Sequence, residues 1–148
     1  MSASADKTAQ ALSHLLADSY TLYVKTHNFH WNVTGPMFTT LHTLFETQYT
    51  ELALAVDEIA ERIRALGVVA PSSYAAMDSA ATLKSDASET SADGMVADLL
   101  KGHETVIATI RKTLDLAGEH GDEATADVLT PRLTAHEKTA WMLRSTLG

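Results

Sequence analysis

Four long stretches of this chain place apolar residues three or four positions apart, and none alternates convincingly as a β-strand would. This spacing lines one face of an α-helix, so the pattern predicts an all-α protein. The predicted helices cover about 6–31, 37–66, 92–117 and 122–147. Their inward faces are predicted to hold Leu12, Leu16, Tyr20 and Val24 in the first; Leu41, Phe45, Gln48, Leu52, Ala55, Ile59, Ile63 and Leu66 in the second; Val96, Leu99, His103, Val106, Ile110 and Leu114 in the third; and Leu133, His136, Ala140, Leu143 and Leu147 in the fourth. Their apolar faces need partners, and a four-helix bundle within one domain, residues 1–148, satisfies all four at once.

The connections between these stretches refine the prediction. The segment from Gly67 to Ser91 is too long for a tight turn, and Tyr74 to Leu83 within it has the composition of a short helix. Gly67 stands where a helix C-terminus favours glycine. Thr130-Pro131 is expected to kink the fourth helix or to restart it, with Thr130 as the N-cap. Two helices, a long crossover and two more helices resemble the ferritin-like form of the bundle.

Composition excludes several kinds of function. The formal net charge of -8 argues against a polyanion as the main partner, because phosphate binding requires clustered lysine and arginine. The chain has no cysteine, which excludes disulfides, thiolate metal sites and cysteine nucleophiles. The N-terminus lacks an apolar signal core and no apolar run is long enough to span a bilayer, so a cytoplasmic location without membrane association is expected.

Two pairs of metal-ligand side chains lie on the second predicted helix. His42 and Glu46 are four residues apart, as are Asp57 and Glu61, and each pair therefore projects from one helix face. The two pairs are nevertheless separated by about 16 Å or more along the helix axis. One metal centre cannot use both pairs from a single helix.

A second copy of the chain removes this obstacle. An antiparallel helix, related by a two-fold axis between positions 51 and 52, places His42 opposite Glu61 of the partner subunit and Glu46 opposite Asp57 of the partner subunit. His30 ends the first helix close to the start of the second and joins the same group. This mixed set of imidazole and carboxylate suits ferrous iron, manganese or zinc better than calcium.

The usual ferritin-type centre inside one bundle is not predicted. It needs Glu-x-x-His pairs on two helices, and the sequence contains none. The nearest features, His103-Glu104 and His136-Glu137, are adjacent residues that point about 100° apart. Both histidines lie on apolar stripes and are interpreted as hydrogen-bonded core residues.

The residues around these ligands resemble the Dps family, the mini-ferritins named as DNA-protection proteins of starved cells. The resemblance covers nearly the whole chain and is carried above all by His27-Asn28-Phe29-His30-Trp31-Asn32-Val33-Thr34-Gly35-Pro36, Phe38, Leu41-His42 and Asp57-Glu58-Ile59-Ala60-Glu61-Arg62. It implies a dodecameric shell of two-fold dimers with ferroxidase sites at the dimer interfaces. Matched position by position, the resemblance implies that the metal ligands of each site are His30, His42 and Glu46 from one chain and Asp57 and Glu61 from the other. Position 46 is often Asp in the family, which leaves open whether Glu46 binds metal directly or through water.

The resemblance further implies iron storage and detoxification. The family oxidises Fe(II), commonly with hydrogen peroxide, and stores the ferric product as a mineral. Paired irons at each site could deliver two electrons to one peroxide, and zinc or manganese could replace iron there. Trp31 and Tyr49 lie close enough to the ligands to quench stray oxidising equivalents, and Asp122 and Asp127 are expected to line a three-fold pore that attracts cations.

Two other functions compete with this interpretation. The first is DNA compaction, the property that gives the family its name. Members that bind DNA can use a lysine-rich tail, whereas Lys7 is the only lysine or arginine among the first 24 residues here, so tight DNA binding is not expected. The second is a helical bundle without metal chemistry, which would show no saturable oxidation of Fe(II).

Overall fold

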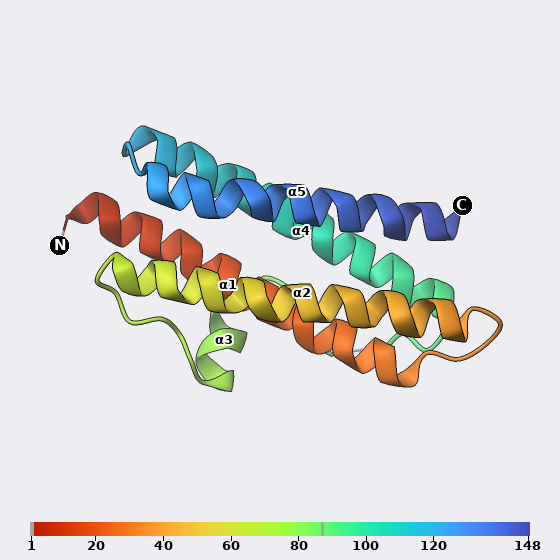
Figure 1. Cartoon of the computed structure of the whole chain (residues 1–148). Helices are drawn as coiled ribbons and strands as arrows, with labels where there is room; N and C mark the ends of the chain where they lie inside the picture. Colours follow the sequence, from red (N-terminus) through yellow and green to blue (C-terminus); the bar gives the residue numbers. More distant parts are fainter. Residues whose placement is uncertain (1, 87) are drawn as a thin grey trace.

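The computed structural model describes residues 2–86 and 88–148, and within them it contains five helices and no strand. The prediction of an all-α fold is therefore confirmed. The helices are α1 (Ala3–Asn32), α2 (Phe38–Ala65), α3 (Tyr74–Ala80), α4 (Ala92–Glu119) and α5 (Glu123–Leu147). α1 and α2 form one antiparallel hairpin and α4 and α5 a second (Figure 1). The crossover carries the short α3 and returns the chain, so that α2 and α4 run in the same direction (Figure 1).

Side-chain caps and one glycine define the helix ends. Four helices begin at a side chain that accepts a hydrogen bond from the backbone N–H three residues later, at distances of 3.0 to 3.2 Å. These N-cap residues are Ser2, Ser73, Ser91 and Asp122. These contacts satisfy donors that the first helical turn leaves free. Gly67 follows α2 with φ of +89°, a left-handed conformation that glycine adopts without strain, as its position in the sequence predicts.

The predicted inward faces of α2 and α4 are confirmed, and those of α5 and α1 are only partly correct. In α5, Leu143 is buried but Leu147 is 40% exposed in the last turn. Leu12 and Leu16 are buried, but Val24 is 37% exposed. The core side of α1 continues instead through Leu22 and Phe29. α1 packs against α2, α3 and α4, so its buried surface is broader than a single stripe.

α5 continues without a break through Pro131, so the predicted restart at Thr130 is wrong. Pro131 lies on the exposed side of the helix, where water can satisfy the carbonyl that its missing N–H leaves free. Thr130 does not act as an N-cap, because its Oγ1 donates to the carbonyl of Ala126 in the preceding turn at 3.0 Å. Packing of the buried neighbours Leu129 and Arg132 keeps the helix in one piece.

The crossover is fastened to α1 by a buried carboxylate. Oδ1 of Asp18 accepts hydrogen bonds from the backbone N–H groups of Thr82 and Leu83 at 2.7 and 2.9 Å. Nearby, α1 and α4 approach so closely that a Cβ atom at Gly102 would lie 2.6 Å from Leu22 Cδ2. These contacts fix how the two hairpins lie against each other.

Candidate metal centre

The end of α1 and the start of α2 bring two histidines into contact. α1 ends at Asn32, and a short turn leads into α2 at Phe38. The rings of His30 and His42 stack with centroids 3.8 Å apart and planes 14° from parallel. Nδ1 of His30 lies 2.7 Å from the carbonyl oxygen of His42, and Nδ1 of His42 lies 2.8 Å from the carbonyl oxygen of His30.

These reciprocal contacts determine which ring nitrogens carry hydrogen. A carbonyl oxygen only accepts hydrogen bonds, so the Nδ1 atoms of both His30 and His42 must donate. In its neutral form each ring then has its free lone pair on Nε2. A metal-binding histidine is commonly oriented in this way, by a carbonyl that fixes the other ring nitrogen. The pair is therefore preorganised to offer two nitrogen ligands.

The three predicted carboxylate ligands are exposed and do not reach one point within the chain. Glu46 lies one turn beyond His42 on α2. Asp57 lies fifteen residues beyond His42, a distance of about 22 Å along the helix, and Glu61 lies one turn further. Across residues 2–86 and 88–148, no three His, Asp or Glu side chains gather closely enough to hold a metal ion. A complete centre from the five predicted residues requires carboxylates of another chain.

Comparison with known proteins identifies the family of the chain. A ferritin-like domain family matches residues 9–148. DNA protection during starvation protein 2 of Bacillus anthracis is 40% identical over 139 residues, which cover 94% of this chain and 95% of the relative. The chain belongs to the Dps family. No helix in the described part of the chain has the length and apolarity needed to cross a membrane.

Solved structures of the family have the same fold. A Dps protein from Bacillus brevis matches this Dps chain with a TM-score of 0.96 at 36% identity, covering 100% of this chain and 99% of its own. The Dps protein from Vibrio cholerae O1 matches with a TM-score of 0.95 at 35% identity, covering 98% and 91%. It is described as a member of a broad superfamily of ferritin-like diiron-carboxylate proteins. The ferritin-like form of the bundle is thereby confirmed.

Aromatic rings surround the histidine pair in this Dps chain. The ring of His27 contacts Trp31 and Tyr49, with centroid distances of 3.9 and 4.3 Å. Tyr49 also packs edge-on against His30 at 5.2 Å. Partial burial, and then the proximity of His30, lower the pKa of His27. Sequence reasoning left His27 outside the site, although its spacing of three and four residues from His30 and Trp31 places all three on one side of α1.

The two predicted pore carboxylates have different surroundings. Asp122 caps α5 and forms an ion pair with Arg62 at 2.9 Å. Burial alone would raise the pKa of Asp122, but hydrogen bonds from Thr125 and the charge of Arg62 outweigh this effect and lower it. Asp127 is exposed on α5 and takes part in none of the ion pairs found among the described residues. The pore assignment stays a prediction for both.

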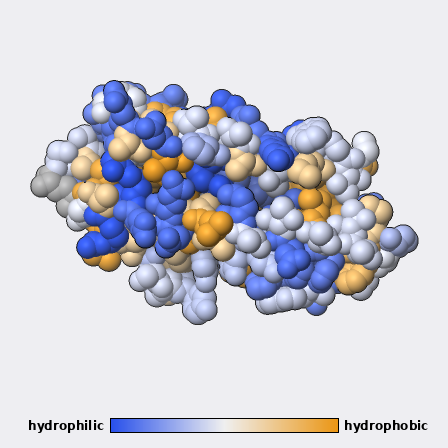
Figure 2. Space-filling view, viewed as in Figure 1, coloured by the Kyte–Doolittle hydropathy of each residue, from blue (hydrophilic) through white to orange (hydrophobic). Residues whose placement is uncertain are grey.

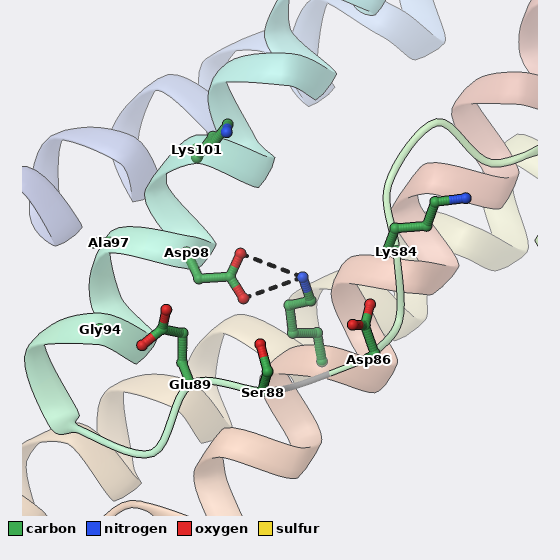
Figure 3. A pocket seen from close by; sticks show the side chains of 9 residues that line it. Lys84, Asp86, Ser88, Glu89, Gly94, Ala97, Asp98 and Lys101 are labelled. Carbon is green, nitrogen blue, oxygen red and sulfur yellow. Dashed lines mark hydrogen bonds and ion pairs between the residues drawn. The ribbon is translucent and has the colours of Figure 1, made fainter.

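The surface pockets lie elsewhere. One of about 410 Å³ opens between α1, the crossover and the start of α4 (Figure 3). Its Lys25 pairs with both oxygens of Asp98 at 3.1 and 3.3 Å, and it contains none of the predicted ligands.

Hydrophobic residues form separate patches on the face shown in Figure 2. Large exposed apolar side chains include Trp31, Leu54, Val69, Tyr74 and Trp141.

Proposed function

We propose that this Dps chain is a ferroxidase subunit that detoxifies and stores iron in the cytoplasm. Two chains would share each oxidation site, with His30, His42 and Glu46 from one and Asp57 and Glu61 of the partner subunit. Twelve such chains, assembled from two-fold dimers, would form a shell that holds the ferric product as a mineral. Iron is the substrate and cargo of this reaction.

The observation that carries the proposal is the reciprocal hydrogen bonding of His30 and His42. It leaves two imidazole lone pairs free on adjacent rings, and borderline ions such as Fe(II) accept this kind of nitrogen ligand together with carboxylate oxygen. The exposed Asp57 and Glu61 enter no ion pair within the described part of the chain. They are thus available to a neighbouring chain.

The site residues have distinct tasks in this proposal. The imidazoles hold Fe(II) in fixed positions, and the carboxylates neutralise the charge that grows as Fe(II) becomes Fe(III). Two Fe(II) ions each lose one electron, and hydrogen peroxide takes up both electrons and two protons as its O–O bond breaks to give two waters. Oxidation in pairs avoids the hydroxyl radical that a single electron would release. Zinc or manganese could occupy the same ligands without this reaction.

Anaerobic addition of Fe(II), followed by hydrogen peroxide, tests the proposal. Fast oxidation should saturate at two Fe(II) per site in the native chain and be lost in His42→Ala and Asp57→Asn shells of normal size. A rate that increases without saturation, equal in all three proteins, would reject the ferroxidase function.

DNA protection by compaction is the alternative function. The name of the Bacillus anthracis relative favours it. The net charge of -8 opposes it, because an acidic surface repels the phosphate backbone. Iron oxidation is therefore the function we infer, and DNA protection would follow from the removal of Fe(II) and peroxide.

A further inference from the structure

A second histidine pair lies in the middle of the bundle, away from the proposed site. Nδ1 of His103 on α4 lies 2.8 Å from Nδ1 of His136 on α5, and these side chains are 2% and 1% exposed. This confirms the prediction of hydrogen-bonded core histidines. Arg132 extends this hydrogen-bond network. Its Nη2 lies 2.9 Å from Nε2 of His136, and its Nη1 forms an ion pair with Glu51 on α2. We call these four residues the core cluster.

The guanidinium sets the direction of every hydrogen bond in the core cluster. Arg132 has only donors, so Nε2 of His136 must accept. The hydrogen of neutral His136 is then on Nδ1, which donates to Nδ1 of His103. The hydrogen of His103 is consequently on Nε2. Burial, and then the charge of Arg132, lower the pKa of His103 to about 3, which keeps this ring neutral.

This arrangement occupies both imidazole lone pairs of the core cluster and one carboxylate oxygen of Glu51. A neutral imidazole has one ring lone pair, and those of His103 and His136 are both used in hydrogen bonds. The carboxylate of Glu51 is neutralised by Arg132. Yet two histidines and a carboxylate from three helices are the residue types that ferritin-like bundles direct inward to bind iron.

An additional oxygen ligand lies close to the core cluster on α2. Gln48 precedes Glu51 by one turn and is 5% exposed, and neither its amide oxygen nor its amide nitrogen has a hydrogen-bond partner among the described residues. A groove between α2 and α5, of about 290 Å³, is lined by Gln48 and Glu51. The side chain of Glu51 is 47% exposed, so ions in solvent can approach the outer end of the core cluster.

We propose that Arg132 is a built-in cation that keeps divalent metal ions out of the bundle core, and so determines where this protein binds metal. Its charge repels an entering cation, and its two Nη groups occupy Nε2 of His136 and one carboxylate oxygen of Glu51. The inference deepens the proposed function, because it confines iron to the shared site. Its test does not require that site to be active.

Zinc is a suitable probe because it does not undergo redox chemistry and scatters anomalously. Crystals of the native shell and of Arg132→Met, Arg132→Lys and Arg111→Met shells are soaked in zinc chloride, and equilibrium dialysis counts the ions bound. Arg132→Met removes the charge at similar volume, whereas Arg132→Lys retains it. Arg111→Met removes the same charge from an exposed ion pair with Glu137. Only Arg132→Met should gain an anomalous peak between Glu51 and His136, and one extra zinc per chain.

Two results would overturn the proposal: zinc at the core cluster of the native shell, or no zinc there in a correctly assembled Arg132→Met shell. If that variant does not assemble, Arg132→Gln is subjected to the same measurements. Nitrogen-15 spectra of the native histidines provide a separate check, since hydrogen on Nδ1 of His103 would contradict the assignment. Zinc at the interface in every variant reports on the proposed function alone, so the two inferences can fail independently.

Discussion

Nδ1 of His30 donates to the backbone carbonyl of His42, and Nδ1 of His42 donates to the backbone carbonyl of His30, although twelve residues separate them along the chain. The end of α1 and the start of α2 are thus joined by the same two side chains that we propose as nitrogen ligands of the metal ion. Loss of either ring removes that ring's own hydrogen bond to the opposite carbonyl and leaves the remaining ring without its stacking partner. Both imidazoles act as one unit, contributed by one chain.

Mixed shells test whether this unit works with carboxylates of a second chain. His42→Ala and Asp57→Asn shells should each be inactive, whereas a shell assembled from equal amounts of both chains should regain about a quarter of native activity. Random pairing makes half of the dimers mixed, and each mixed dimer has one intact site of two. The rate of peroxide-dependent Fe(II) oxidation measures the recovery.

A matched mixture provides the control. His30→Ala and His42→Ala chains have their defects on the same side of the site, so every site in their mixed dimers contains one defect. Recovery should occur only in the first mixture. If neither mixture recovers although both assemble, the sharing of sites between chains is wrong.

The sequence determined most of the fold because the helices of this chain are regular and their ends are marked. The position of Gly67 predicted the end of α2, where this glycine adopts a positive φ. The apolar residues spaced three or four apart in α2 and α4 predicted the buried faces of these helices. Val24 was misjudged, and of the two alternatives predicted at Pro131 the restart of the helix was wrong. The burial of α1 depends on three neighbouring helices, and packing on both sides of Pro131 maintains α5 despite the missing hydrogen bond.

The candidate site was predicted as residues but not as contacts. Spacing placed His30 near His42, but it could not show that each ring donates to the carbonyl of the other. Such contacts depend on the turn between α1 and α2. The core histidines were predicted individually, and their link to Glu51 through Arg132 was not, because that link joins residues 81 positions apart.

The core histidines should make stability depend on pH. The pKa of His103 is about 3 in the folded chain against an ordinary value of 6.5, so the unfolded chain binds more protons between these values. Stability is complete above about pH 6.5 and falls as pH decreases. His103 alone should cost about 2 kcal/mol at pH 5. Denaturant unfolding at pH 7.5 and pH 5 measures the loss.

Two variants identify the source of this pH dependence. His103→Gln keeps a hydrogen-bonding side chain but does not titrate, so its stability should fall less between pH 7.5 and pH 5 than that of the native chain. His14→Gln changes an exposed histidine and should retain the native decrease. An identical decrease in all three proteins would exclude the core histidine as the cause.

Trp31 should protect the protein during turnover. It contacts His27, whose ring stacks on Tyr49 beside His30, so an electron can leave the aromatic cluster close to the proposed site. Trp31→Phe should increase backbone cleavage and cross-linking during oxidation of Fe(II) by peroxide, as measured by mass spectrometry. Trp141→Phe is the matched control, because the two tryptophans are 62% and 60% exposed. Equal damage in both variants would contradict a protective role for Trp31.

Neutralising the predicted pore carboxylates should slow iron entry and leave oxidation at the site intact. Asp127→Asn should lengthen the phase of iron uptake. Asp78→Asn on α3 is the control: it removes the same charge from another exposed position and should leave iron uptake unchanged. Stopped-flow absorbance separates uptake from oxidation of pre-bound Fe(II). Unchanged uptake in Asp127→Asn combined with Asp122→Asn would reject the pore assignment.

Asp122 should behave differently from Asp127 in stability measurements. Asp122→Ala removes the α5 cap and the partner of Arg62, and should cost about 1–2 kcal/mol. The lowered pKa of Asp122 means that its contribution is present above its ordinary pKa near 3.8 and is lost as pH falls below it. The difference between Asp122→Ala and the native chain should therefore shrink in strong acid. A difference that is equal at pH 7 and pH 3 would contradict this origin.

The net charge predicts how the shell responds to DNA. Each chain carries a formal charge of -8, and Lys7 is the only lysine or arginine within the first 24 residues, so few cations can replace the counterions of the duplex. Plasmid DNA should keep its free mobility with the shell at roughly 150 mM salt, where nonspecific electrostatic contacts are weak. Divalent cations could bridge two acidic surfaces, so the assay is repeated with magnesium and with EDTA. A shift that persists in EDTA at this salt concentration would establish direct DNA binding and favour compaction as the function.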